Sequence, residues 1–470
     1  MKSKFMDVQL KRPLEIMSVI ALMASFFGIN LGSIFSFREH LKSLFMLDSY
    51  DLDSIFGVFL LGALAGSFFG GFIVYGSGRK IGIIVSFALA VAADCAGALA
   101  PSFSTLLLSE IVAGAACGIF MVASLIYACE ISYPSLRGML CSMPLLGFVA
   151  GLEFVIVCRG MIPVNSGVSV SFIAFIGACL VFYCLVRMPE SPRWLACSRF
   201  NEAALASLIV LRGSQLVAAR ELALINDRQR IPDRGAELFL HSGLFRSALW
   251  LILIMSFMIH MGGMTFIPYS ALDLVCFYQQ QFLGYFYSCS FDYGYGFIKA
   301  SCTACFFGVL SACLLAGRIS RVGSMLAGIS ANMFILMLLS GVAMLNLSSL
   351  STLLLSSLIL ILIYVSSFTL TVFLTIFVPE FLPTAGREFG VSFALIINFA
   401  AMMACIRELR PLVATYSLGT FFAFCAGACV IFIVITSRRM PETGNGTLES
   451  LESLLFEDKL LNTRHIHSKG

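Results

Sequence analysis

The sequence predicts an all-α protein whose helices cross a membrane many times. Three observations predict this class: hydrophobic residues make up 59% of the 470 residues, charged residues make up only 12%, and the mean hydropathy is +0.96. A water-soluble chain of this size would have to expose much of that apolar surface to solvent. The apolar residues also fall into runs long enough for a helix to cross a bilayer, which takes about 20 residues.

Six apolar runs fill the first part of the chain, and each is long enough for one crossing. The predicted crossings are 16–37, 55–75, 81–100, 105–129, 139–158 and 168–188. The first run is longer than the apolar core of a secretory signal, so we expect this helix to stay in the protein. The segment before it, 1–15, is polar and basic.

Six further runs follow a long polar segment. The predicted crossings are 247–270, 298–316, 324–345, 350–377, 390–406 and 412–436. In the intervening segment, 189–246, the residues Ala203, Leu205, Leu208 and Leu211 recur at helical intervals, which predicts short amphipathic helices. The expected organisation is therefore two six-helix bundles, 16–188 and 247–436, with a linking segment between them and a polar tail, 437–470.

The distribution of basic residues predicts the orientation. With the N-terminus in the cytoplasm, only six of the 30 lysines and arginines fall on the outer side. They are Arg38, Lys42, Arg159, Lys299, Arg407 and Arg410. Because basic residues collect on the cytoplasmic side of membrane proteins, we expect both termini in the cytoplasm, and we take the plasma membrane as the location.

Charged motifs recur after corresponding crossings of the two bundles. Glu130 precedes Arg137 by seven residues, and Glu380 precedes Arg387 by the same interval. The tripeptide Met-Pro-Glu follows the sixth crossing and again the twelfth. This order implies two homologous bundles, an architecture typical of transporters whose halves rock about a central site.

The motifs resemble those of the sugar porter branch of the major facilitator superfamily. They read Glu-Ile-Ser-Tyr-Pro-Ser-Leu-Arg-Gly at 130–138, Pro-Glu-Ser-Pro-Arg-Trp at 189–194 and Pro-Glu-Thr-Gly-Asn-Gly-Thr-Leu at 441–448. The resemblance covers nearly all of the chain. It implies twelve helices in two pseudo-symmetric bundles and transport of a small solute, with no enzymatic reaction.

The resemblance also implies a cytoplasmic gate, in which charged residues of the two bundles pair when the cavity opens outward and separate when it opens inward. The candidate residues are Arg79, Lys80, Glu130, Arg137, Glu190, Arg193, Arg318, Arg321, Glu380, Arg387 and Glu442. Tyr75-Gly76-Ser77 stand where the family has an acid and a base, so fewer ion pairs are expected here. The alternative is that these charges only anchor the helices as solvated pairs.

The sugar-binding positions differ from those of the family. Where family members bind sugar hydroxyls with amides and a tryptophan, this chain has Leu145, Met258, Ile259, Met264 and Thr375. The polar candidates that remain are Asn30, His260, Thr265, Tyr269, Ser270 and Asn398. Because each unsatisfied buried polar group costs about 1–3 kcal/mol, these replacements argue against glucose and favour another small polar solute, a sugar or polyol.

Asn30 bears on the energy source of transport. Proton-coupled members of the family resemble one another in carrying Asp at this position, and an amide cannot titrate, so Asn30 favours facilitated diffusion. Asp94, Glu110 and Glu153 lie inside apolar runs, where a charge costs at least about 2.5 kcal/mol. Proton symport through Glu110 or Glu153 is therefore the alternative, and a sensor that has lost transport is a third.

Other features predict structure rather than chemistry. We expect a monomer that contacts a solute and the lipid bilayer, with no nucleic acid, metal or cofactor. The 16 cysteines contain no metal-binding pattern and are expected to be free thiols, although Cys276 and Cys289 could face an oxidising side. Glycines at intervals of four predict close helix packing, and they are Gly62, Gly66, Gly70, Gly114, Gly118, Gly147 and Gly151.

Overall fold

The computed structural model is a bundle of long helices. It describes residues 2–456 apart from 37, 48, 159–175, 178, 182, 185, 229–234, 266–269, 273, 277, 279–290, 345–348 and 445. Within this part of the chain, eleven helices are long and apolar enough to cross a membrane. The predicted sixth crossing, 168–188, lies mostly outside the described residues.

The N-terminal half contains five of these helices and one short one. Its helices are α1 (Lys2–Ser36), α2 (Arg38–Phe45), α3 (Ser49–Ser77), α4 (Arg79–Ala98), α5 (Phe103–Ile131) and α6 (Arg137–Cys158). The C-terminal half is built from α12 (Gly243–Met261), α14 (Phe291–Leu315), α15 (Arg321–Met344), α16 (Ser349–Leu370), η2 (Thr371–Phe377), α17 (Val378–Phe381), η3 (Thr384–Gly386), α18 (Arg387–Tyr416) and α19 (Leu418–Arg439).

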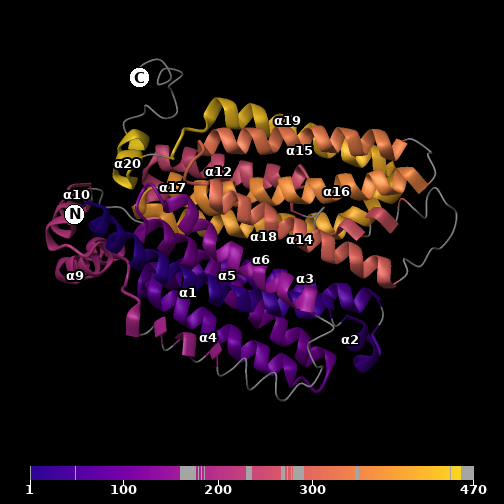
Figure 1. The fold of residues 1–470 in the computed structure, drawn as a ribbon, viewed down its shortest axis with the longest axis horizontal. Helices are drawn as coiled ribbons and strands as arrows, with labels where there is room; N and C mark the ends of the chain where they lie inside the picture. The colour runs from indigo at the N-terminus through magenta and orange to yellow at the C-terminus, as the bar shows by residue number, and fades with distance from the viewer. Residues whose placement is uncertain are drawn as a thin grey trace.

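Short helices lie at one end of the molecule. Between the halves, the chain forms α8 (Pro192–Cys197), α9 (Asn201–Arg212), α10 (Gln215–Arg228) and α11 (Ala236–His241). The tail forms α20 (Leu448–Phe456), which lies at the same end and contacts α10 and α17. The tail and the linking segment therefore meet where the two halves come together (Figure 1).

The two halves are packed in the same way. Figure 1 shows the N-terminal half (indigo to magenta) beside the C-terminal half (orange to yellow). Helix α5 packs against α3 and α4 in the first half, and α16 packs against α14 and α15 in the second. Between the halves, α3 packs on α18 and α6 packs on α14. In the predicted order of crossings, the α3–α18 contact joins the second and eleventh crossings, and the α6–α14 contact joins the fifth and eighth. Exchanging the two halves turns one contact into the other, so the interface is pseudo-symmetric.

Glycines set the closest approaches within the N-terminal half. A Cβ placed on Gly66 of α3 would lie 2.0 Å from the carbonyl oxygen of Ala115 on α5, and one on Gly147 of α6 would lie 1.9 Å from that of Ala21 on α1. The helices therefore touch at backbone distance, which confirms the packing expected from the glycine spacing.

Two helix ends differ from the sequence prediction. Helix α12 ends at Met261 instead of continuing to residue 270, because Gly263 adopts φ 76° and its N–H donates to the carbonyl of His260. Helix α18 continues to Tyr416, and the next helix begins at Leu418 rather than at 412. The break falls at Ser417, whose φ is 73° and whose hydroxyl caps the N–H of Thr420.

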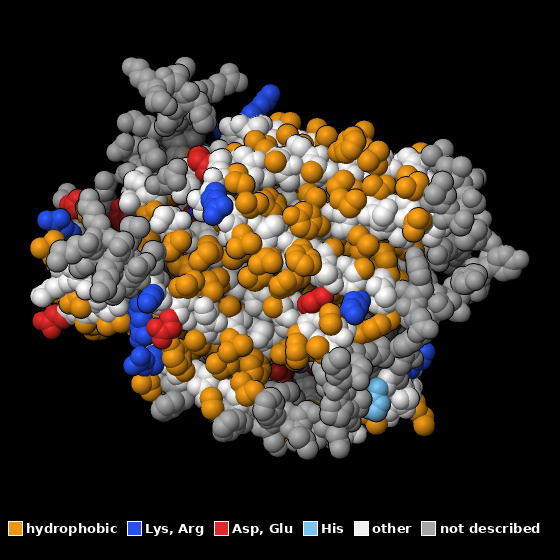
Figure 2. Space-filling view, viewed as in Figure 1, with side chains coloured by type: hydrophobic (Ala, Val, Ile, Leu, Met, Phe, Trp, Pro, Cys, Tyr) orange, Lys and Arg blue, Asp and Glu red, His pale blue; other side chains and the backbone are white. Residues whose placement is uncertain are grey.

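The exterior is that of a protein surrounded by lipid. Large apolar side chains such as Phe72, Leu108, Trp250 and Phe424 are exposed on the long helices. Figure 2 shows hydrophobic side chains spread over the middle of this face, while most charged side chains gather at the end where α9 and α10 lie. An apolar band of this extent is stable against lipid tails and would be unfavourable in water.

Candidate transport site and gate

One end of the molecule holds a cluster of buried charges between the halves. We define the charged end by Arg79, Glu130, Arg137, Glu380 and Arg387, each of which is at most 1% exposed. Arg79 begins α4 and Glu130 ends α5, while Arg387 begins α18. Charged residues that stand just before or after apolar runs in the sequence thus lie at the same level of the molecule. Ion pairs so well shielded from water are screened little by salt.

The first set of ion pairs crosses between the halves. Arg79 Nε lies 2.9 Å from Glu130 Oε2 within the N-terminal half, and Arg79 Nη2 lies 2.5 Å from Glu388 Oε1 of the C-terminal half. Arg387 Nη1 lies 3.3 Å from Glu130 Oε1. Glu130 therefore accepts from one arginine of each half, and the charged end is closed.

The second set of ion pairs at the charged end has longer distances between the charged groups. Arg137 Nη1 lies 4.0 Å from Glu380 Oε1 across the halves, and Arg321 Nε lies 3.5 Å from Glu380 Oε2 within the C-terminal half. Arg137 also donates to the carbonyl of Gly446, and Thr443 donates to Glu380 at 2.8 Å. Glu380 with Arg321 thus repeats the arrangement of Glu130 with Arg79.

Two of the predicted gate acids act inside their own halves. Glu190 accepts from the backbone N–H groups of Arg79 (2.9 Å) and Lys80 (3.2 Å), at the start of α4. Glu442 accepts from Arg321 N (2.8 Å) in the same way, at the start of α15. Carboxylates at these positions satisfy free N–H groups and complement the helix dipole. Burial raises the pKa of Glu190 above its ordinary value, and the backbone N–H groups only partly oppose this.

Gly78 makes the first of these caps feasible. Its φ is 94°, and a Cβ there would lie 2.4 Å from Glu190 Oε2. We expect Gly78→Ala to displace Glu190 and lower stability by about 1–3 kcal/mol, because it combines a strained backbone with a clash. The thermal unfolding midpoint measures this effect. Gly76→Ala, where nothing lies within 4 Å, is the control, and equal midpoints for the two variants would contradict the expectation.

The sequence prediction missed two acidic residues of the charged end. Glu388 pairs with Arg79, and Glu449 of α20 pairs with Arg193 of α8. Glu388 gives Arg79 a second carboxylate partner, from the other half, and the one sequence signal for it was its place beside Arg387. Among the remaining predicted gate residues, Arg318 is exposed and forms no ion pair with any described residue.

The Arg193–Glu449 pair ties the tail to the linking segment. Burial alone would raise the pKa of Glu449, but the Arg193 guanidinium outweighs it and holds the pKa below its ordinary value. A depressed carboxyl pKa stabilises the folded form above the unfolded pKa, and the effect is lost as pH falls through the folded pKa.

We therefore expect Glu449→Gln to loosen α20 at neutral pH. Amide hydrogen exchange in 448–456 should become roughly tenfold faster or more, since a hydrogen bond to a charged group contributes about 1.5–3 kcal/mol. The wild-type protein should show the same loosening only on acidification. Exchange that is equally slow in the variant would show that other contacts hold the helix.

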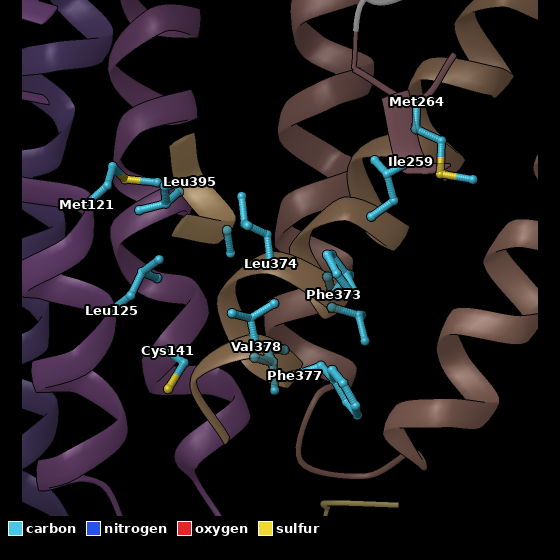
Figure 3. Close-up of a cluster of buried hydrophobic side chains, with 14 of the residues drawn as sticks. Met121, Leu125, Cys141, Ile259, Met264, Phe373, Leu374, Phe377, Val378 and Leu395 are labelled. Atoms are coloured by element: carbon cyan, nitrogen blue, oxygen red, sulfur yellow. The ribbon is translucent and has the colours of Figure 1, made fainter. Parts of the chain in front are cut away.

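Apolar side chains of both halves pack against one another in the interior. In Figure 3, Met121 and Leu125 of α5 lie on one side with Leu395 of α18 beside Met121, and Leu374 and Val378 lie on the other. Of the positions that bind sugar in the family, Ile259 and Met264 are each 1% exposed, and Thr375 is buried with its hydroxyl donating to Thr371 O.

The predicted polar ligands lie in different places. His260, at the end of α12, and Thr265 are buried and hydrogen-bond to each other through Nδ1 and the hydroxyl, while His260 Nε2 has no partner among the described residues. Ser270 and Asn398 are buried on the C-terminal half. Tyr269 lies outside the described residues. The pair His260 and Thr265 therefore offers one buried nitrogen to a ligand.

The three acids inside helices have polar neighbours. Asp94 Oδ1 accepts from Asn30 Nδ2 at 2.8 Å, and Glu110, which is 4% exposed, lies beside both. Glu153 Oε1 accepts from the hydroxyl of Thr303 at 2.6 Å, a contact from α6 to α14 across the halves. Asp94 and Glu110 therefore share one site, and Glu153 belongs to another.

The expectation of free thiols is wrong at one position. Cys276, which follows α12, is disulfide-bonded. Cys289 lies outside the described residues.

Comparison with known proteins identifies the family. The model of the family described as "Sugar (and other) transporter" matches residues 16–455. The chain belongs to this family. It is therefore a membrane sugar transporter of the major facilitator superfamily and not an enzyme, as the sequence motifs predicted.

Relatives and solved structures cover nearly the whole chain. The galactose-proton symporter of Escherichia coli (strain K12) is 24% identical over 465 residues, 95% of each chain. The arabinose-proton symporter of the same strain is 27% identical over 462 residues, 95% of this chain and 94% of the relative. The proton:xylose symporter XylE of E. coli, bound to 6-bromo-6-deoxy-D-glucose, aligns with a TM-score of 0.76 and 18% identity over 94% of this chain and 99% of XylE. The alignment with XylE shows that this protein has the predicted major facilitator fold.

Proposed function

We propose that this sugar-transporter family member moves a small polar solute, a sugar or polyol, by alternating access. The observation that carries the proposal is the closed charged end, where Arg79 and Glu130 of one half bind Glu388 and Arg387 of the other. Breaking these pairs opens a path between the halves from that end, and forming them closes it. Two such states are what a rocking transporter requires.

The proposal for the substrate rests on the names of the relatives and on the apolar character of the side chains between the halves. The relatives are named for galactose and arabinose. The side chains that pack between the halves are mostly apolar (Figure 3), and the buried pair His260 and Thr265 is one of the few hydrogen-bonding groups near them. A solute with fewer hydroxyls than a hexose leaves fewer groups unsatisfied there, so a pentose or a small polyol is favoured.

Uptake by purified protein in liposomes tests the function. We expect labelled L-arabinose, D-xylose and erythritol, which have fewer hydroxyls than a hexose, to enter faster than D-galactose and D-glucose. Liposomes that contain heat-unfolded protein give the background. Background rates for all five solutes, together with a ligand-dependent rise in unfolding temperature, would instead favour a sensor that binds without transport.

We propose that the charged end and both termini face the cytoplasm of the plasma membrane, in a monomer. The excess of basic residues on this side supports the orientation. Because disulfides persist in oxidising compartments, the bond at Cys276 supports a non-cytoplasmic place for this residue. A protease added to intact cells should leave an epitope on the tail uncut, and light scattering in detergent should give the mass of one chain. Cleavage or a larger mass would refute the respective proposal.

The energy source has two candidates. Facilitated diffusion rests on Asn30, whose amide cannot titrate. Proton symport is favoured by the Asn30–Asp94 hydrogen bond, because a titratable carboxyl stands next to the amide. The names of the relatives, which are proton symporters, favour it as well. Acidification of the liposome lumen when sugar enters decides between them.

A further inference from the structure

A pair of carboxyl groups lies inside the N-terminal half, away from the charged end. Asp94 of α4 and Glu110 of α5 are neighbours, and Asn30 of α1 donates to Asp94 Oδ1 at 2.8 Å while also lying next to Glu110. Glu110 precedes Glu130 by 20 residues on one helix, so the two are separated by about 30 Å. The pair is therefore distinct from the gate.

Two buried oxygens at this site have no hydrogen-bond partner among the described residues. They are Glu110 Oε2 and Asn30 Oδ1, and the side chain of Glu110 is only 4% exposed. An amide oxygen and an ionised carboxylate oxygen are both acceptors, so they cannot satisfy each other. A proton on Glu110 Oε2 would turn this atom into a donor, and the side chain of Asn30 beside it offers Oδ1 as an acceptor.

The pair has no compensating cation among the residues that the structure describes. In the part of the chain that the structure describes, neither carboxyl makes an ion pair with lysine, arginine or histidine. The titratable group beside them is the Cys95 thiol. On the neighbouring helices, Arg12 and Glu15 of α1 and Tyr75 of α3 lie near the charged end, and Glu153 of α6 is bonded to Thr303. Two negative charges inside a membrane helix bundle without a cation are costly, so the site requires a positive charge.

We propose that Asp94 and Glu110 form a proton-binding pair, bridged by Asn30, that couples solute movement to proton entry. The inference rests on the proposed transport function. One proton is shared: Glu110 carries it as a carboxylic acid, and Asp94 accepts the Asn30 N–H as a carboxylate. The site takes up H⁺ from the side opposite the charged end and gives it to the cytoplasm after the halves rock. Asn30 acts as the residue that positions the two carboxyl groups. Because these groups carry the proton, coupling does not need an acid at position 30.

Proton flux in liposomes tests the coupling. With a pH-sensitive dye inside, addition of L-arabinose or D-galactose to wild-type liposomes should acidify the lumen. Glu110→Gln and Asp94→Asn should each lose this acidification and the dependence of uptake on an imposed pH gradient. Exchange of labelled sugar at equal concentrations on both sides should persist, which shows that the variants fold and bind. Glu153→Gln is the matched control, because it removes another acid inside a helix, and it should retain acidification.

A second measurement does not depend on transport. Infrared spectroscopy of the purified protein should show a protonated-carboxyl band that is lost in Glu110→Gln and kept in Glu153→Gln. Sugar uptake without acidification in the wild type, or acidification that survives Glu110→Gln, would overturn the inference and leave the transport function intact. If none of the sugars moves, the transport function fails instead. A band that is unchanged by Glu110→Gln would then overturn the inference independently.

Discussion

Glu130→Gln is expected to shift the protein from the form with a closed charged end to the form in which that end is open. Arg79 of the same half donates to both carboxylate oxygens of Glu130, and Arg387 of the other half donates to Oε1. Glutamine has one acceptor oxygen and no charge, so buried Arg387 loses its counter-ion Glu130, and Arg79 keeps only Glu388. Breaking a buried pair costs about 3–5 kcal/mol, which shifts the ratio of the two forms by roughly two to three powers of ten.

Cys129 reports this shift without any added label. It is fully buried beside Glu130, and its thiol donates to the carbonyl of Pro379 in the other half at 3.4 Å. Opening of the charged end exposes it, so its alkylation by a maleimide should become at least roughly a hundredfold faster in Glu130→Gln, in keeping with the population shift. Mass spectrometry of the tryptic peptides measures the rate.

The controls separate gate opening from unfolding. Cys117 is buried on the same helix, three turns away from Cys129, and its alkylation rate should not change. Glu202→Gln makes the same chemical change on the exposed face of α9 and should leave both rates as in the wild type. If Cys129 is no more reactive in Glu130→Gln than in Glu202→Gln, these ion pairs do not hold the gate closed.

The second set of ion pairs predicts a weaker effect. Arg137 and Glu380 are 4.0 Å apart, and Arg137 also binds Gly446 O. We expect Arg137→Ala and Glu380→Gln to slow transport while expression and membrane insertion stay near normal. Sugar uptake per molecule of protein measures this. Wild-type turnover in both variants would show that the second set does not contribute to the gate and that the ion pairs of Arg79 and Glu130 close it without help.

The gate was predictable from sequence because its residues sit where crossings end and recur in both halves. The lengths of the helices place these residues at one level of the molecule: Glu130, Arg137, Glu380 and Arg387. Glu388 and Glu449 were not predictable, since their partners Arg79 and Arg193 are distant in the chain and only tertiary packing brings them together.

The fold was predictable for a similar reason. Apolar runs of sufficient length define the crossings, whereas the ends of α12 and α18 depend on the conformation of single residues, Gly263 and Ser417. The pairing of Asp94 with Asn30 joins α4 to α1 and has no signal in local sequence. A polar residue in an apolar run indicates that a partner is needed, but not which helix supplies it.

Gly66→Ala is expected to destabilise the N-terminal half more than any other single methyl group introduced on α3. The new Cβ would lie 2.0 Å from the carbonyl oxygen of Ala115 and 2.6 Å from its carbon, and both are backbone atoms of α5. Backbone cannot rotate aside as a side chain can, so α3 and α5 must separate along this contact. We expect a loss of about 3 kcal/mol or more, at the upper end of the range for overpacking, and a clear fall in the thermal unfolding midpoint.

Gly57→Ala on the same helix is the matched control, because nothing lies within 4 Å of a Cβ there. It should leave stability unchanged or raise it by about 0.5–1 kcal/mol, since alanine favours helix over glycine. The contrast between the two variants isolates the helix contact from the intrinsic propensity of α3. Equal midpoints would mean that α3 and α5 do not touch at Gly66 in the membrane, and the rigid N-terminal half that alternating access requires would lose its main support.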